Sequence, residues 1–185
     1  MDLTGQLLIA MPEMADDRFA RSVVLVVSHG EDGAMGLVLN QPVASPGFTE
    51  VLDELGIEVN GEAAITLPRV LRGGPVEQGR GFVLHSLDHS GPGTLRVGDD
   101  VGMSTTLDIL RKVASPEPPR RSALYLGYAG WGGGQLEQEI ASNGWLTVED
   151  AQDLVLKTPP DRIYQAALSR LGVDEALLSG AAGHA

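Results

Sequence analysis

The chain contains no cysteine. This excludes disulfide bonds, a thiolate nucleophile and metal sites built from cysteine, and it suits a reducing compartment. No apolar run approaches the roughly 20 residues that a membrane span needs. The N-terminal run Leu7–Met11 stops at Pro12 and follows no basic leader. We therefore expect a cytoplasmic protein that does not enter a membrane.

Basic residues are scarce, with 13 Lys and Arg against 25 Asp and Glu, which gives a formal net charge of -12. That charge repels a phosphate backbone and disfavours direct nucleic-acid binding. The densest basic groups, Arg69 with Arg72 and Arg120 with Arg121, are pairs and not stripes. Aromatic residues make up only 4% of the chain, so a surface for stacking bases is not expected either.

Apolar residues are plentiful and are arranged in short runs. With 185 residues and 43% hydrophobic content, the chain suits a single domain over 1–185, in which the small, polar end 179–185 is a frayed tail. Gly30 to Gly33 holds an Asp-Gly pair between two runs, which predicts a tight antiparallel hairpin. Gly36 marks a bulge or a close approach of two backbones. The predicted strands are Leu7–Met11, Ser22–Ser28, Leu37–Asn40, Gly81–His85 and Ala123–Tyr128.

Helical patterns lie between and after these strands without a regular βαβ rhythm, which predicts an α+β fold. Thr105 with Asp108, and Thr147 with Asp150, have the spacing of a capping box at a helix start. Five helices are predicted. Three have the bounds Phe48–Leu55, Gln135–Ser142 and Asp161–Leu171, one begins at Thr105, and a short one begins at Thr147.

The richest chemical candidate is the glycine-rich segment Gly127–Gly134, which also holds Tyr128, Gly130 and Trp131. It leaves a strand and enters a helix, a context in which backbone N–H groups cradle phosphate. Its spacing matches neither a P-loop nor a dinucleotide fingerprint, and the acidic turn that follows repels phosphate. Close backbone packing is therefore the favoured interpretation.

The histidines supply the other candidates. His85-Ser86-Leu87-Asp88-His89 gathers two imidazoles and a carboxylate, but its spacing is not that of a known metal motif. His29 could pair with a serine such as Ser86 as a nucleophile and base, yet no G-x-S-x-G elbow is present. The turn Arg72–Val76, with Gly73 and Gly74, could bind an anion or simply reverse the chain.

Taken in order, several segments resemble the bacterial YqgE/AlgH family, from about residue 4 to 171. This resemblance implies an α+β fold with a bifurcated, mixed β-sheet, a small barrel-like part and surrounding helices. It implies little about function, because the family is largely uncharacterised and one namesake is described as a regulator of alginate production. The segments are Leu7–Pro12, Phe19 with Ser22–Val24, His29 with Gly33–Asn40, Gly73–Val76, Gly81–Ser86, Gly127–Trp131, Gln135–Glu137 with Glu139 and Ile140, and Asn143 with Trp145 and Leu146.

Three functions follow as hypotheses. The first is a regulatory module that acts indirectly by binding a protein or a small molecule, without catalytic residues, cofactor or metal. The second is a hydrolase or metal-dependent enzyme that uses His29 or His85, which requires those side chains to converge. The third, direct nucleic-acid binding, is disfavoured by charge. The candidate ligand-binding residues are His29, Asn40, Gly73, Gly74, His85, Tyr128, Gly130 and Trp131.

Overall fold

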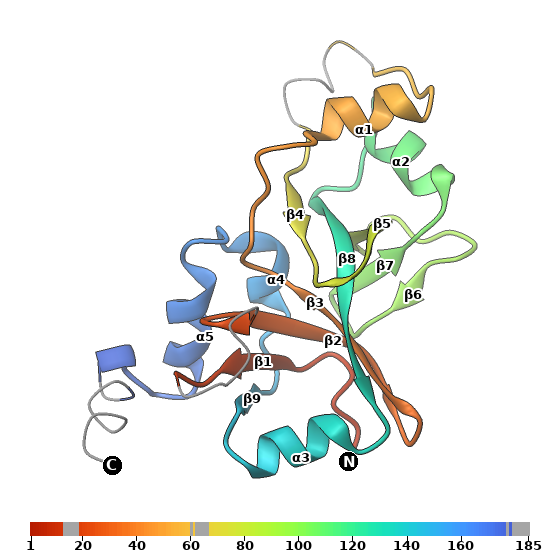
Figure 1. Cartoon of the computed structure of the whole chain (residues 1–185). Coiled ribbons are helices and arrows are strands. Elements are labelled where there is room, and N and C mark those ends of the chain that lie inside the picture. The colour runs from red at the N-terminus through yellow and green to blue at the C-terminus, as the bar shows by residue number, and fades with distance from the viewer. Residues whose placement is uncertain (13–18, 60, 62–66, 177, 179–185) are drawn as a thin grey trace.

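The strands join into one curled, mixed sheet with helices around it, shown in Figure 1 as a computed structural model. The structure describes residues 1–12, 19–59, 61, 67–176 and 178. The strands are β1 (Leu7–Ala10), β2 (Val23–Gly30), β3 (Gly33–Val38), β4 (Val70–Arg72), β5 (Val76–Ser86), β6 (Leu95–Arg96), β7 (Val101–Ser104), β8 (Ser122–Gly132) and β9 (Trp145–Val148). The helices are α1 (Phe48–Glu54), α2 (Leu107–Val113), α3 (Gln135–Ala141), α4 (Asp153–Lys157) and α5 (Ile163–Arg170).

The long strand β8 connects the two halves of the sheet. Its first part pairs with β5 and, in parallel, with β4, whereas its last part pairs with β3. The order along the sheet is β6-β7-β5-β8-β3-β2-β1-β9, with β4 off this path. Every named strand pair except β4 with β8 is antiparallel. The predicted α+β fold with a bifurcated, mixed sheet is confirmed.

Glycines allow the chain to cross β8 where the sheet divides. A Cβ on Gly74, whose φ is 157°, would overlap the carbonyl group of Tyr128. A Cβ on Gly127 would lie 2.6 Å from the carbonyl oxygen of Gly74. Real Cβ atoms do not approach so closely, so no side chain fits at these two positions. The expected close packing of backbones is present here.

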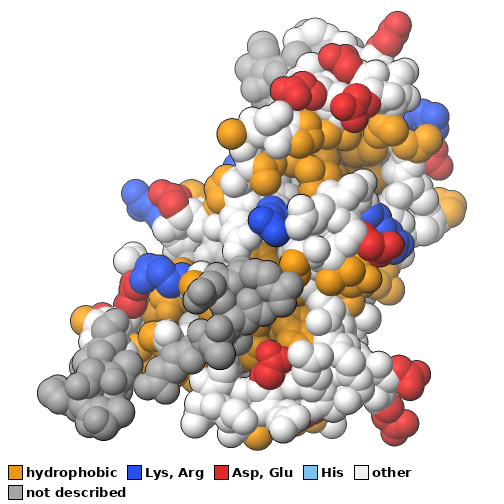
Figure 2. Space-filling model, in the orientation of Figure 1, with side chains coloured by type: hydrophobic (Ala, Val, Ile, Leu, Met, Phe, Trp, Pro, Cys, Tyr) orange, Lys and Arg blue, Asp and Glu red, His pale blue; other side chains and the backbone are white. Residues whose placement is uncertain are grey.

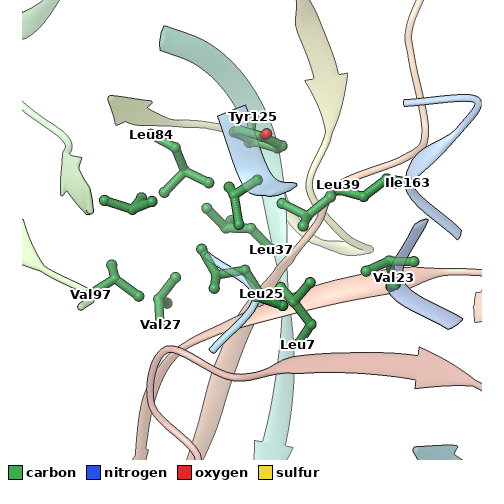
Figure 3. Close-up of a cluster of buried hydrophobic side chains, with 14 of the residues drawn as sticks. Leu7, Val23, Leu25, Val27, Leu37, Leu39, Leu84, Val97, Tyr125 and Ile163 are labelled. Atoms are coloured by element: carbon green, nitrogen blue, oxygen red, sulfur yellow. The ribbon is translucent and has the colours of Figure 1, made fainter. Parts of the chain in front are cut away.

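Apolar side chains fill the space inside the curled sheet. Along β2, Val23, Leu25 and Val27 belong to one buried cluster, whereas Val24 and Val26 belong to another on the opposite face. Because successive side chains of a strand point to opposite faces, a strand that is buried on both sides reads as a continuous apolar run. Figure 3 shows how side chains from β1, β2, β3, β5 and β8 meet in the first cluster.

The helices cover different parts of the sheet. In Figure 1, α1 and α2 lie at one end of the molecule, over the half that contains β4, β5 and β8. A third apolar cluster joins Phe48 and Leu52 of α1, Ile109 of α2, and Val83 and Leu124 of the sheet. Helix α5 packs on β1 and β2, α4 packs on α5 and β5, and α3 packs on β3, β8 and β9.

The predicted hairpin and bulge are confirmed, while both capping boxes are wrong. β2 and β3 pair up to Gly30 and Gly33, and the register shifts between Val26 and Ser28, opposite Gly36. Thr106, not Thr105, precedes α2, and its side chain makes no capping bond. Thr147 pairs with Leu8 inside β9, so sheet formation overrides the local helix signal there. Helix α4 begins later, at Asp153.

Candidate functional site

An open apolar groove lies between α1, α2 and the sheet, and we call it the α1–α2 groove. Its volume is about 260 Å³. Figure 2 shows hydrophobic side chains gathered below the acidic side chains at the α1 end of the molecule. The groove is lined by Val51, Glu54, Leu55, Gly79, Gly81, Val83, Ser104, Thr105, Thr106, Leu107, Ile109, Leu110, Leu124 and Leu126.

The floor of the groove is formed by the sheet under the helices. Val83 and Leu124 pair across β5 and β8 and form its floor. Gly81 has no side chain, and a Cβ there would lie 3.2 Å from a methyl group of Leu124. At the rim, Leu55 and Leu107 are each 45% exposed. An apolar hollow with leucines on its rim is typical of a binding surface.

The α1 side of the groove is acidic. Glu50, Asp53, Glu54 and Glu58 are all exposed. In the part of the chain that the structure describes, none of these carboxylates forms an ion pair. Their charges therefore remain available to a cation that approaches the groove.

A buried chain of hydrogen bonds runs beside the groove from Ser104. The His85 Nδ1–H donates to the carbonyl oxygen of Ser86 at 3.0 Å, and the Ser104 hydroxyl lies 2.8 Å from His85 Nε2. The Ser104 hydroxyl also contacts Thr94 Oγ1 at 2.9 Å, which in turn accepts from the backbone N–H of Gly91 at 3.3 Å. Burial lowers the pKa of His85, so its ring is neutral and Nε2 accepts the Ser104 proton.

This pair has the connectivity of a serine nucleophile and its base, but its surroundings are closed. Ser104 is 2% exposed and His85 is 0% exposed. The Ser104 oxygen is already held between His85 and Thr94, so a substrate could not reach it without displacing a partner. The arrangement instead fastens β5, β7 and the Thr94 loop to one another, with every polar atom partnered.

His29 lies in a separate environment at the end of β2. Its Nδ1 accepts a hydrogen bond from the backbone N–H of Leu3 at 3.0 Å, and its Nε2–H donates to the Glu137 carboxylate. The backbone N–H of Glu137 and the bond from His29 lower the pKa of that carboxyl. Both ring nitrogens of His29 are thus occupied, and the residue shares no hydrogen-bond partner with His85. The two histidines do not converge on one site.

The remaining predicted residues are also spread over the molecule. The Asn40 carboxamide binds the backbone of Val23 at 3.0 Å and of Arg21 at 2.9 Å. Trp131 is buried and packs on Phe19 and Trp145, with ring centroids 6.5 Å and 6.0 Å away. Of the predicted set, Gly73, Gly74 and Tyr128 meet where the chain crosses β8, while Gly130 lies exposed further along that strand.

The two motif-based sites lack the geometry that their ligands need. Helix α3 follows the glycine-rich segment, but Glu137 in its first turn already binds His29. Gln135 Oε1 accepts from the Gly132 N–H at 3.0 Å, so this amide is occupied too. The rings of His85 and His89 lie 5.9 Å apart, and in the described ranges no three His, Asp or Glu side chains gather as a metal site.

The α1–α2 groove was not predicted from the sequence. The sequence does hold a partial indication of it. Leu55 and Leu107 widen the apolar surface that α1 and α2 already have at the buried positions Leu52, Ile109 and Leu110. Such a set shows excess apolar surface, but it does not show where the two helices place it.

Comparisons with known proteins place the chain among bacterial relatives over its whole length. A model of the AlgH-like family matches residues 7–176. A UPF0301 protein of Ruegeria pomeroyi is 53% identical over 100% of both chains. One of Bradyrhizobium diazoefficiens is 50% identical over 99% of this chain and 88% of its own length.

Two solved structures have the same fold. The solution structure of the AlgH protein from Pseudomonas aeruginosa superposes with a TM-score of 0.79 at 41% identity, covering 97% of this chain and 94% of that one. A crystal structure of a Corynebacterium diphtheriae protein gives 0.71 at 23% identity, over 90% and 85%. None of the described helices has the length and apolar character to span a bilayer.

Proposed function

This chain belongs to the AlgH-like family, and from that premise we propose that it is a cytoplasmic binding module whose α1–α2 groove receives a large apolar side chain of a partner protein. The observation that carries the proposal is the open apolar groove with Leu55 and Leu107 on its rim, each 45% exposed. Leaving such side chains in water forgoes about 25 cal/mol for each Å² that a partner would cover. A partner that covers them recovers this free energy.

The size of the groove favours a protein partner over a metabolite. Its volume of about 260 Å³ lies below the roughly 300–1,000 Å³ of typical small-molecule sites. It is enough for one or two apolar side chains, which is how anchor residues enter a partner's surface. The acidic residues of α1 favour a segment that carries Lys or Arg beside its apolar anchor, because opposite charges speed and orient association.

A regulatory role through such a partner agrees with the charge of the chain. With a net charge of -12, direct contact with DNA is unfavourable, so an effect on gene expression would pass through the bound protein. A hydrolase that uses His29 or His85 has weaker support, because both rings are already fully hydrogen-bonded within the fold.

The test is the binding of a short synthetic peptide with a leucine pair flanked by lysine and arginine, followed by amide chemical shifts and fluorescence anisotropy. We expect shifts at α1, α2 and β7. The double substitution Leu55→Ser with Leu107→Ser should weaken binding by about tenfold or more, or about 1.4 kcal/mol. The matched control is the double substitution Leu95→Ser with Leu171→Ser. These two leucines are 46% and 39% exposed and lie outside the groove, so this variant should bind the peptide as the wild type does.

Two peptide controls separate the apolar and charged contributions. A peptide with serine in place of the leucine pair should not bind, and one with glutamate flanks should bind weakly. Equal binding by the groove variant and the control variant, or no binding of the lysine and arginine peptide at all, would refute the proposal.

A further inference from the structure

Arg69 is distant in the sequence from the neighbouring Arg120 and Arg121, but all three line one hollow in the structure. β4 and β8 run in parallel, and the Leu124 N–H donates to the carbonyl oxygen of Arg69 at 3.0 Å. This pairing brings the start of β4 beside the start of β8, where Arg120 and Arg121 lie. The hollow has a volume of about 440 Å³ and is separate from the α1–α2 groove.

These arginines have no carboxylate partner in the portion of the chain that the structure describes. Within that portion Arg21, Arg80, Arg111 and Arg170 pair with acids, whereas Arg72, Arg96 and Arg162 form no ion pair either. Asp88 lies near Arg120, but its carboxylate accepts from the backbone N–H of Arg120 at 3.0 Å and forms no ion pair with the guanidinium. In a chain with 25 acidic and 13 basic residues, this hollow is unusual because three arginines and, among its described lining residues, no carboxylate surround it.

The hollow is suited to a small anion with an apolar body. Its other walls include Leu67, Pro68, Val113 and Pro119. A volume of about 440 Å³ falls within the roughly 300–1,000 Å³ of small-molecule sites. One guanidinium group can donate two hydrogen bonds to two oxygens of a phosphate. Several guanidinium groups together suit a ligand with two negative charges, such as a phosphate monoester, better than a ligand with a single carboxylate. We propose that Arg69, Arg120 and Arg121 form a binding site for a small organic phosphate monoester.

The surroundings of the hollow argue for a monoester and against a polymer. Arg120 and Arg121 also line a neighbouring cleft, together with Asp88, Asp99 and Asp100. These three aspartates line the cleft and not the hollow, so a single phosphate that fits inside the hollow contacts the arginines and not the aspartates. The next phosphates of a nucleic-acid strand would meet the aspartates and be repelled.

Calorimetric titration of the full chain with phenyl phosphate, in phosphate-free buffer at constant ionic strength, tests this site. We expect saturable binding, with weaker binding of inorganic phosphate because it lacks the apolar body. Arg69→Gln, Arg120→Gln and Arg121→Gln should each weaken binding about tenfold. All three positions are exposed, so these variants should fold, which thermal unfolding can verify. The matched control is Arg96→Gln, an exposed arginine of β6 that does not line the hollow.

Amide chemical shifts at Ser122 and Leu124 should follow the same titration curve. The inference is overturned if phenyl phosphate does not saturate the protein, or if Arg96→Gln weakens binding as much as the hollow variants do. It is also overturned if a short oligothymidylate binds more tightly than phenyl phosphate. None of these outcomes depends on whether a peptide occupies the α1–α2 groove.

Discussion

The buried, neutral state of His85 predicts a specific loss of stability in acid. Its ring is 0% exposed, and burial lowers its pKa from the ordinary value of 6.5. In the unfolded chain the ring takes up a proton as the pH falls through about 6.5, whereas the folded ring resists protonation to lower pH. The unfolded state therefore binds more protons in that window, and the free energy of unfolding decreases as the pH is lowered.

The size of this effect follows from proton linkage. Between pH 6.5 and the lowered pKa of folded His85, the free energy of unfolding should fall by up to about 1.4 kcal/mol per pH unit. His85→Gln removes the titrating group but keeps an acceptor for the Ser104 hydroxyl. We expect this variant to be about 1–3 kcal/mol less stable at neutral pH and to lack the slope.

Urea unfolding at about pH 7.5, 6.5 and 5.5 measures this difference. The carboxylates titrate in both proteins, so their contributions cancel when the two curves are subtracted. Parallel pH curves for the wild type and His85→Gln would show that the folded ring protonates normally, and the reasoning from burial would then be wrong.

Two further substitutions test the packing. Gly74→Ala places a methyl group against the Tyr128 carbonyl in a backbone conformation with φ of 157°, and it should cost at least about 3 kcal/mol in a denaturant titration. Gly79→Ala meets no atom within 4 Å and should change stability by less than about 1 kcal/mol, so similar losses would contradict the crossing argument. Ser104→Ala breaks the middle of the buried hydrogen-bond chain and should cost about 1–3 kcal/mol in the same assay; an unchanged midpoint would mean that this chain contributes no stability.

Local patterns predicted the elements that depend on local contacts. The Asp-Gly pair predicts the β2–β3 hairpin from neighbouring residues alone, and Gly36 lies opposite the register shift. The sequence does not predict the strands β4, β6, β7 and β9, which have two to four residues and, unlike the equally short β1, are not uniformly apolar or have only two residues. Strands of that length carry almost no periodicity, and partners distant in the sequence stabilise them.

The two sites could not be predicted for the same physical reason. Arg69 lines the same hollow as Arg120 only because β4 pairs in parallel with β8. In the sequence, Arg69 stands close to Arg72 and Arg120 stands beside Arg121, which gives two separate pairs and no sign of a common site. The groove depends on how α1 and α2 sit over one sheet face, although their apolar excess at Leu55 and Leu107 was visible. His85 was identified as a candidate, but Ser104, its partner across the sheet, has no signature in the sequence.

The position of β8 in the middle of the sheet also affects how the protein can be made. β3, β4 and β5 are all translated before β8, yet each of them pairs with it. Until residue 132 has left the ribosome, these strands have open edges, and β1 still awaits β9 after that. Contacts between such distant segments close slowly. We therefore expect the sheet to stay incomplete through most of the synthesis of the chain, with its two halves joining only after β8 has been made.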